Sequence, residues 1–149
     1  MTQSISQQTQ QTQQPQSTEQ QIQTHIDACL KLVTDALDDV KAKNITVLDV
    51  TNLTDVADRM VITEGTSKRH VQALADHVSV TAKQAGYLPL GREGEKESDW
   101  TLVDLGSVVV HVMMPQAREF YDLEGLWSSP EQLAQLTQPV HDKRSYENR

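Results

Sequence analysis

The sequence predicts an α+β fold, in which a mixed β-sheet is covered by helices. Two long segments carry apolar residues at spacings of three and four, which is typical of amphipathic helices. Several short runs are rich in β-branched residues, which favour strands. Two of these runs are separated only by Gly106 and Ser107, which indicates an antiparallel hairpin.

The first helix is expected over residues 22–40. Its apolar stripe consists of Ile22, Ile26, Cys29, Leu30, Val33, Leu37 and Val40. Ser17 and Gln20 have the spacing of a capping box, although they fall in a glutamine-rich stretch. Strands follow over residues 45–50 and 59–63, and Gly65 closes the second of them. A second helix then begins near Thr66 or Ser67 and ends at Gly86.

The last part of the predicted core is a short strand followed by the hairpin. Residues 88–90 are expected to form a short edge strand, because proline is tolerated at sheet edges. Residues 91–98 read as a charged loop. The hairpin strands span residues 100–105 and 108–114, and a helical turn follows Pro115. Trp100, Leu102 and Asp104 share one strand face, and Thr101, Val103 and Leu105 share the other, so one face packs on helices and the other is open to a partner.

Composition divides the chain into a core and two polar ends. Residues 1–21 are a glutamine-rich extension that cannot bury enough apolar surface to fold, and residues 128–149 are a polar tail. The folded domain is expected over residues 22–127. No apolar run is long enough to span a membrane and no signal peptide is visible, so a cytoplasmic protein is expected. Cys29 alone cannot form an internal disulfide.

The charge is acidic and unevenly distributed. The formal net charge is −8, and residues 93–124 hold eight acidic residues against Lys96 and Arg118. Binding to nucleic acid depends on neutralising phosphates, so little direct RNA contact is expected. A basic protein is a better expectation for the partner. The alternative is that the acidic residues only keep the protein soluble.

Three segments together resemble the ribosomal silencing factor family, also called the Iojap family. They are residues 65–78, which begin Gly65, Thr66, Ser67; residues 99–113, which begin Asp99, Trp100, Thr101; and residues 118–127, which end Gly125, Leu126, Trp127. The three motifs occur in order and in register, and the resemblance covers about residues 26–127. The glutamine-rich extension and the C-terminal tail lie outside it.

The resemblance implies a fold related to nucleotidyltransferases but without their catalytic carboxylate pair. It also implies a protein that binds the large ribosomal subunit through its fourteenth ribosomal protein, which is basic. Such a protein sterically blocks association with the small subunit and represses translation when nutrients are scarce, as in stationary phase. It is not an enzyme and needs no cofactor. The sequence leaves open whether the protein forms a homodimer.

The residues at the start of the second helix also raise the alternative of an enzyme. Gly65, Thr66 and Ser67 at a helix start could hold a phosphate, but an ordinary helix cap is the favoured interpretation. Asp99 and Asp104 are five residues apart and fall on opposite faces, so they cannot form the carboxylate pair that holds magnesium. His70 and His77 are about 10 Å apart by helical rise and cannot share one metal ion, so packing roles are expected.

The candidate partner-binding residues lie on and beside the hairpin: Glu93, Trp100, Asp104, Leu105, Met113 and Tyr121. Trp100 is the predicted anchor, because a tryptophan flanked by acidic residues is a plausible interface centre. The alternative is that Trp100 only packs under the charged loop. Tyr121 and Trp127 are equally suited to packing the terminal turn and to touching a partner. A residual nucleotide-binding or transferase activity and a homodimerising adaptor unconnected to the ribosome remain as rival functions.

Overall fold

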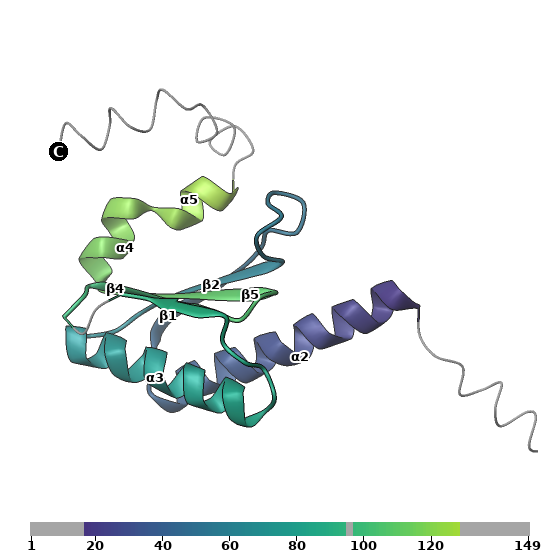
Figure 1. Cartoon of the computed structure of the whole chain (residues 1–149). Coiled ribbons are helices and arrows are strands. Elements are labelled where there is room, and N and C mark those ends of the chain that lie inside the picture. Colours follow the sequence, from purple (N-terminus) through teal and green to yellow (C-terminus); the bar gives the residue numbers. More distant parts are fainter. Residues whose placement is uncertain (1–16, 95–96, 129–149) are drawn as a thin grey trace, which may run out of the picture.

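The computed structural model describes residues 17–94 and 97–128 and contains one five-stranded sheet between two layers of helices (Figure 1). The elements, in chain order, are α2 (Thr18–Asp39), β1 (Lys43–Asp49), β2 (Arg59–Glu64), α3 (Lys68–Gln84), β3 (Gly91–Glu93), β4 (Trp100–Asp104), β5 (Val108–Met113), α4 (Pro115–Tyr121) and α5 (Leu123–Ser128). The expected α+β class is confirmed. No helix within these residues is long and apolar enough to cross a membrane.

The sheet is mixed, with strand order β1-β2-β5-β4-β3. Strands β2 and β5 are parallel, and the other three pairs are antiparallel. The expected hairpin is present, with Trp100 opposite Met113 and Asp104 opposite Val109. The parallel pair arises because α3 carries the chain back along the sheet before the hairpin returns beside β2.

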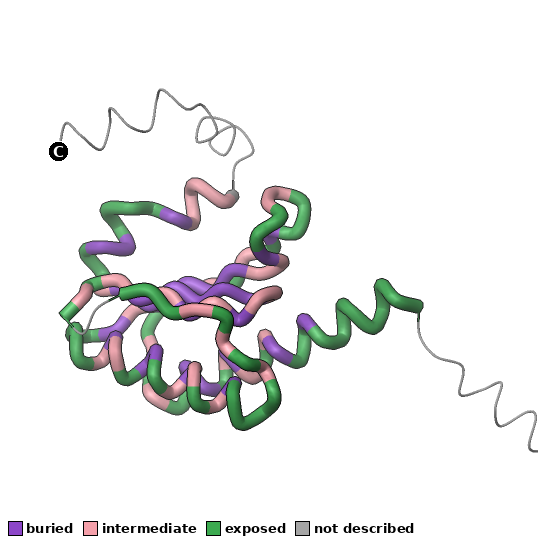
Figure 2. Tube along the Cα trace, viewed as in Figure 1, coloured by how far each residue is buried: buried purple, intermediate pink, exposed green. Residues whose placement is uncertain are grey.

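The two faces of the sheet bury different cores. Helices α2 and α3 cover one face, where Val33, Leu37, Leu74, Val103 and Val110 are among the fully buried side chains (Figure 1). The smaller helices α4 and α5 lie over the other face, where Ile62, Met113 and Leu123 are buried. Figure 2 shows that the first turns of α2 extend past the sheet and are exposed. Burial by packing therefore begins at Ile26.

Two expected boundaries differ from the structure. Helix α2 begins at Thr18 with Ser17 as its N-cap, so it starts within the extension expected over residues 1–21 and before the expected helix start at residue 22. The capping box of Ser17 and Gln20 is formed in full, and glutamine is a good helix former, so the helix extends beyond its buried stripe. The rest of that extension, residues 1–16, and residues 129–149 of the tail lie outside the described residues.

The edge strand is displaced from residues 88–90 to Gly91–Glu93, within the segment expected to be a loop. The Leu90 amide donates a hydrogen bond to the Asp104 carbonyl at 2.7 Å, which brings the chain alongside the end of β4. The ladder then begins with Gly91 opposite Asp104. Pro89 has no amide hydrogen to continue the ladder in the other direction, which explains why the strand starts only after it.

Candidate partner-binding site

The candidate site lies on the sheet face opposite α2 and α3, over strands β4 and β3. Side chains of Trp100, Leu102 and Asp104 point to this face and are partly exposed, while Thr101 and Val103 point to the helix-covered face and are buried. This alternation confirms the two faces expected for the strand. Helices α4 and α5 contact mainly β5 and β1, and on β4 the side chains of Trp100, Leu102 and Asp104 stay partly exposed.

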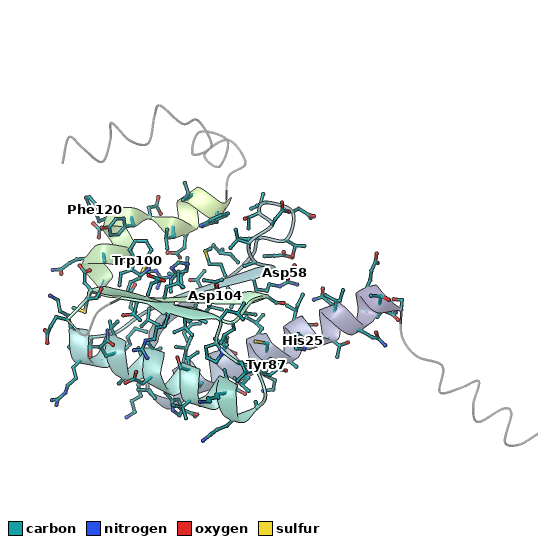
Figure 3. All side chains as sticks on the ribbon, viewed as in Figure 1. His25, Asp58, Tyr87, Trp100, Asp104 and Phe120 are labelled. Carbon is teal, nitrogen blue, oxygen red and sulfur yellow. The ribbon has the colours of Figure 1, made fainter. Side chains whose placement is uncertain are left out.

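Trp100 is both packed and accessible. Its indole Nε1–H donates a hydrogen bond to Nδ1 of His111 at 3.0 Å. The centroid of the Tyr121 ring lies 4.6 Å from the indole, and the two rings are tilted by 47°. The indole therefore lies between the sheet and helix α4, as Figure 3 shows, and it keeps part of its surface exposed. The two interpretations of Trp100, anchor and packed residue, do not exclude each other.

His111 is the buried polar residue beneath this site. It lies at the centre of β5, opposite Leu102 on β4, and is only 5 % exposed. Burial lowers the pKa of His111 to about 4, so the imidazole is neutral near pH 7. The imidazole accepts the Trp100 hydrogen bond at Nδ1 and therefore carries its own proton on Nε2. No pattern in the sequence connects His111 with Trp100, because the two residues lie on different strands, eleven positions apart.

The exposed aromatic surface continues onto α4. Phe120 is 64 % exposed and Tyr121 is 46 % exposed, and their rings meet edge to face with centroids 5.0 Å apart. Phe120, Tyr121 and Trp100 thus form one aromatic patch. Figure 3 shows Trp100 and Phe120 on the same side of the sheet. Phe120 was not among the predicted site residues, because a seven-residue helix gives too short a pattern to tell which of two adjacent aromatic residues is exposed.

Arg118 fixes the helices that carry this patch. Its guanidinium forms a two-pronged ion pair with Glu124 of α5, with both nitrogen–oxygen distances 2.8 Å. It also reaches Glu64 of β2 at 3.1 Å and the hydroxyl of Thr46 on β1 at 2.8 Å. The hydrogen bond from Arg118 lowers the pKa of Glu124, and Glu124 in turn raises the pKa of Arg118. One side chain therefore ties α4 to α5 and to two strands.

The predicted acidic residues lie where an approaching partner could reach them. Glu93 is exposed on β3, opposite Leu102, and so shares the face that carries Trp100. Asp104 is partly exposed, and its Oδ1 also accepts a hydrogen bond from the Gly106 amide at 2.8 Å. Asp104 therefore helps to form the hairpin turn in addition to contributing charge to the face.

Two residues that were predicted to contact a partner, Leu105 and Met113, are buried instead. Leu105 points to the opposite face and packs into the core beneath α2 and α3. Met113 lies on the same face as Trp100 and opposite it on the neighbouring strand, but it is buried in the core on the α4 and α5 side and has no exposed surface. Neither side chain offers surface to a partner, so both leave the proposed site. A sequence pattern gives the face of a strand but not what covers it.

The alternative site at the start of α3 is a helix cap. The Ser67 hydroxyl accepts from the His70 amide at 3.0 Å, and the Thr66 amide donates to Nδ1 of His70 at 2.8 Å. These amides are occupied within the turn. A Cβ atom on Gly65 would come within 2.8 Å of the Val71 nitrogen, so close packing against α3 explains the glycine. No group of three or more metal-ligating side chains occurs within residues 17–94 and 97–128.

The two histidines of α3 connect it to α2. Nε2 of His70 donates to the Val40 carbonyl at 2.7 Å, and Nε2 of His77 lies 3.3 Å from the Asp39 carboxylate. The expected packing roles of both residues are confirmed. Cys29 is buried in the same helix pair, and burial raises the pKa of its thiol, so the thiol is protonated and packs as an apolar group.

Comparisons with known proteins decide the family. The model of the family described as ribosomal silencing factor during starvation matches residues 20–149. The chain belongs to the ribosomal silencing factor family. It is 48 % identical over 97 residues to the ribosomal silencing factor RsfS of Chromobacterium violaceum, covering 65 % of this chain and 80 % of that one. It is 41 % identical over 101 residues to the RsfS of Haemophilus influenzae, covering 68 % of this chain and 99 % of that one.

Solved structures agree with this family assignment. A crystal structure of a protein from Chromobacterium violaceum has a TM-score of 0.68 and 46 % identity, and the match covers 70 % of this chain and 87 % of that one. A crystal structure from Bacillus halodurans has a TM-score of 0.62 and 36 % identity, with 68 % and 94 % of the two chains covered. At these identities and TM-scores, the two solved structures share the fold described above.

Proposed function

We propose that this protein binds the large ribosomal subunit through its fourteenth ribosomal protein and thereby blocks association with the small subunit. The observation that carries the proposal is the family match over residues 20–149, because the family is described by ribosome silencing during starvation. A mouse relative, 37 % identical over 103 residues, is named for mitochondrial assembly of the large ribosomal subunit. That name favours the large subunit as the binding partner.

The surface around Trp100 suits a basic protein. The aromatic patch of Trp100, Phe120 and Tyr121 provides an apolar centre, and aromatic residues are enriched at the centres of interfaces. Exposed carboxylates lie on or next to the elements that carry it: Glu93 on β3, Asp99 next to Trp100, and Glu119 and Asp122 next to Phe120 and Tyr121. This arrangement complements a positively charged partner and disfavours direct contact with phosphates.

Inhibition in this proposal is steric. A protein bound at the subunit interface occupies the surface that the small subunit needs, so its effect follows its concentration relative to its dissociation constant. No bond is made or broken, and neither a catalytic group nor a cofactor takes part. The protein acts where ribosomes are assembled from their subunits, in the cytoplasm, and represses translation when nutrients are limited.

Binding and occlusion are tested by sedimentation with purified large subunits. We expect the wild-type protein to co-sediment and to reduce the formation of complete ribosomes when small subunits are added. Phe120→Ala and Trp100→Ala remove parts of the patch, and loss of a central anchor weakens binding by about 2 kcal/mol, roughly thirtyfold. Leu88→Ala is the matched control, because Leu88 is 66 % exposed and lies outside the patch.

The outcomes separate the parts of the proposal. Full co-sedimentation of a folded Trp100→Ala, Phe120→Ala double variant contradicts the docking surface. Absence of wild-type co-sedimentation contradicts the partner. Binding to large subunits with unchanged formation of complete ribosomes contradicts occlusion. Circular dichroism of each variant establishes that it is folded before its binding is compared.

A further inference from the structure

His111 is a buried polar side chain whose hydrogen bonding is only half complete. Nδ1 accepts the hydrogen bond from Trp100, whereas Nε2 is buried and has no hydrogen-bond partner among the described residues. A neutral imidazole that accepts at Nδ1 must carry a proton on Nε2, so a buried donor is left unpaired. Burying an unpaired donor lowers the free energy of unfolding. This cost is comparable to the gain from the single hydrogen bond that His111 makes.

An apolar ring would fill the same place without this cost. His111 is 5 % exposed, and its neighbours across the sheet are Leu102 on β4 and Ile62 on β2. A phenylalanine there would suit such apolar neighbours and leave no donor unpaired. Stability therefore does not account for the histidine, and its remaining contribution is the acceptor that it provides to Trp100.

We propose that His111 is a positioning residue that holds the Trp100 indole in the orientation required for docking. The hydrogen bond fixes one edge of the indole to β5, and Tyr121 packs against the ring from α4, so little rotational freedom remains. A partner that binds this patch then loses little side-chain entropy on association. The inference rests on the proposed function, because it assigns the orientation of the same docking surface.

The test compares His111→Phe with His77→Phe. His77→Phe makes the same change of side chain on α3, which covers the opposite face of the sheet. We expect His111→Phe to weaken binding to large subunits by about tenfold, equivalent to about 1.4 kcal/mol, while its thermal midpoint stays unchanged or rises. His77→Phe should bind like the wild type. A purely structural role for His111 predicts a lower midpoint and unchanged binding by the folded fraction, which would overturn the inference.

A double-mutant cycle identifies the hydrogen bond as the cause. Trp100→Phe keeps a ring at this position but removes the donor. Because both single variants break the same bond, the Trp100→Phe, His111→Phe double variant should bind no more weakly than the weaker single variant. Additive losses would show that His111 acts independently of Trp100. If Trp100→Ala binds normally, the docking surface itself fails; if only His111→Phe binds normally, the docking surface stands and the positioning role falls.

One measurement needs no substitution at His111. In a Trp127→Phe background, the remaining indole N–H signal belongs to Trp100, and its exchange with solvent can be followed by NMR. A hydrogen-bonded indole should exchange markedly more slowly than the free side chain, even though the ring is partly exposed. Exchange at the rate of a free indole would contradict the positioning role, whether or not His111→Phe folds.

Discussion

Trp100 and His111 are hydrogen-bonded to each other, although one side chain is partly exposed and the other is buried. The indole is partly exposed and available for contact, while the imidazole that accepts its N–H is almost completely buried. Because the imidazole is desolvated, its protonated form is disfavoured and the acceptor persists through the physiological pH range. The hydrogen bond of the exposed Trp100 indole therefore depends on the burial that keeps the His111 imidazole neutral.

The lowered pKa of His111 predicts a dependence of stability on pH. An unfolded histidine binds its proton at about pH 6.5, whereas folded His111 does so only at about pH 4. Between these values the unfolded state binds more protons, so the free energy of unfolding falls as the pH falls. We expect the wild type to lose up to about 3 kcal/mol from this group between pH 7 and pH 4. Urea unfolding across that range should show a smaller loss for His111→Phe, and equal losses would contradict the neutral buried state.

Helices α4 and α5 are too short to be stable alone, so their position depends on tertiary contacts. They span seven and six residues, and Asp122 in the left-handed conformation separates them. Isolated helices of this length are not stable in water. Their apolar side chains Ala117 and Leu123 contribute to the second core, and Arg118 adds the ion pairs to Glu64 and Glu124. The position of Phe120 and Tyr121 in the aromatic patch therefore depends on these core contacts and ion pairs.

Arg118→Lys should therefore be costly, although it keeps the charge. A lysine cannot reproduce the two-pronged pair with Glu124 together with the bonds to Glu64 and Thr46. We expect a loss of about 2–4 kcal/mol in the free energy of unfolding, because two partly buried carboxylates and the Thr46 hydroxyl lose hydrogen bonds that a lysine cannot all replace. Arg92→Lys is the matched control: its pair with Asp76 is largely exposed, so its loss should stay below about 1 kcal/mol. Equal losses in urea denaturation would mean that the Arg118 network adds little stability.

At the scale of the whole molecule, the negative charge is concentrated in the segment that carries most of the candidate site. Most of the net charge of −8 is accounted for by residues 93–124, and Glu93, Asp99, Glu119 and Asp122 of this segment are exposed. Such a field accelerates association with a basic partner more than it strengthens the final complex. The apolar centre and the acidic border therefore contribute to different steps of binding.

Salt should separate these contributions. Raising the ionic strength from 0.1 M to 1 M shortens the Debye length from about 10 Å to about 3 Å, which screens exposed charges. We expect association with the isolated fourteenth ribosomal protein to slow by about tenfold or more, with a smaller change in dissociation. Stopped-flow measurements on the wild type and on Glu93→Gln would test this expectation. An association rate independent of salt would show that the acidic residues only solvate the surface.

Much of this architecture could be read from local sequence patterns. The stripe from Ile26 to Leu37, the cap at Ser67 and the turn at Gly106 each depend on residues within a few positions of one another. Alternation along residues 100–104 likewise separated the helix-covered face from the exposed face. Local patterns were sufficient because each of these features depends on the periodicity of the backbone and on side chains only a few positions apart.

The tertiary structure decided which side chains meet. Arg118 bonds to Glu64 and Thr46, which are 54 and 72 positions away in the sequence. Leu105 and Met113 satisfied the pattern of the site but are covered by other elements, whereas Phe120 is exposed because α4 packs through Ala117 and Arg118 instead. No local pattern contains this information, because burial of a side chain depends on elements brought together only when the whole chain folds.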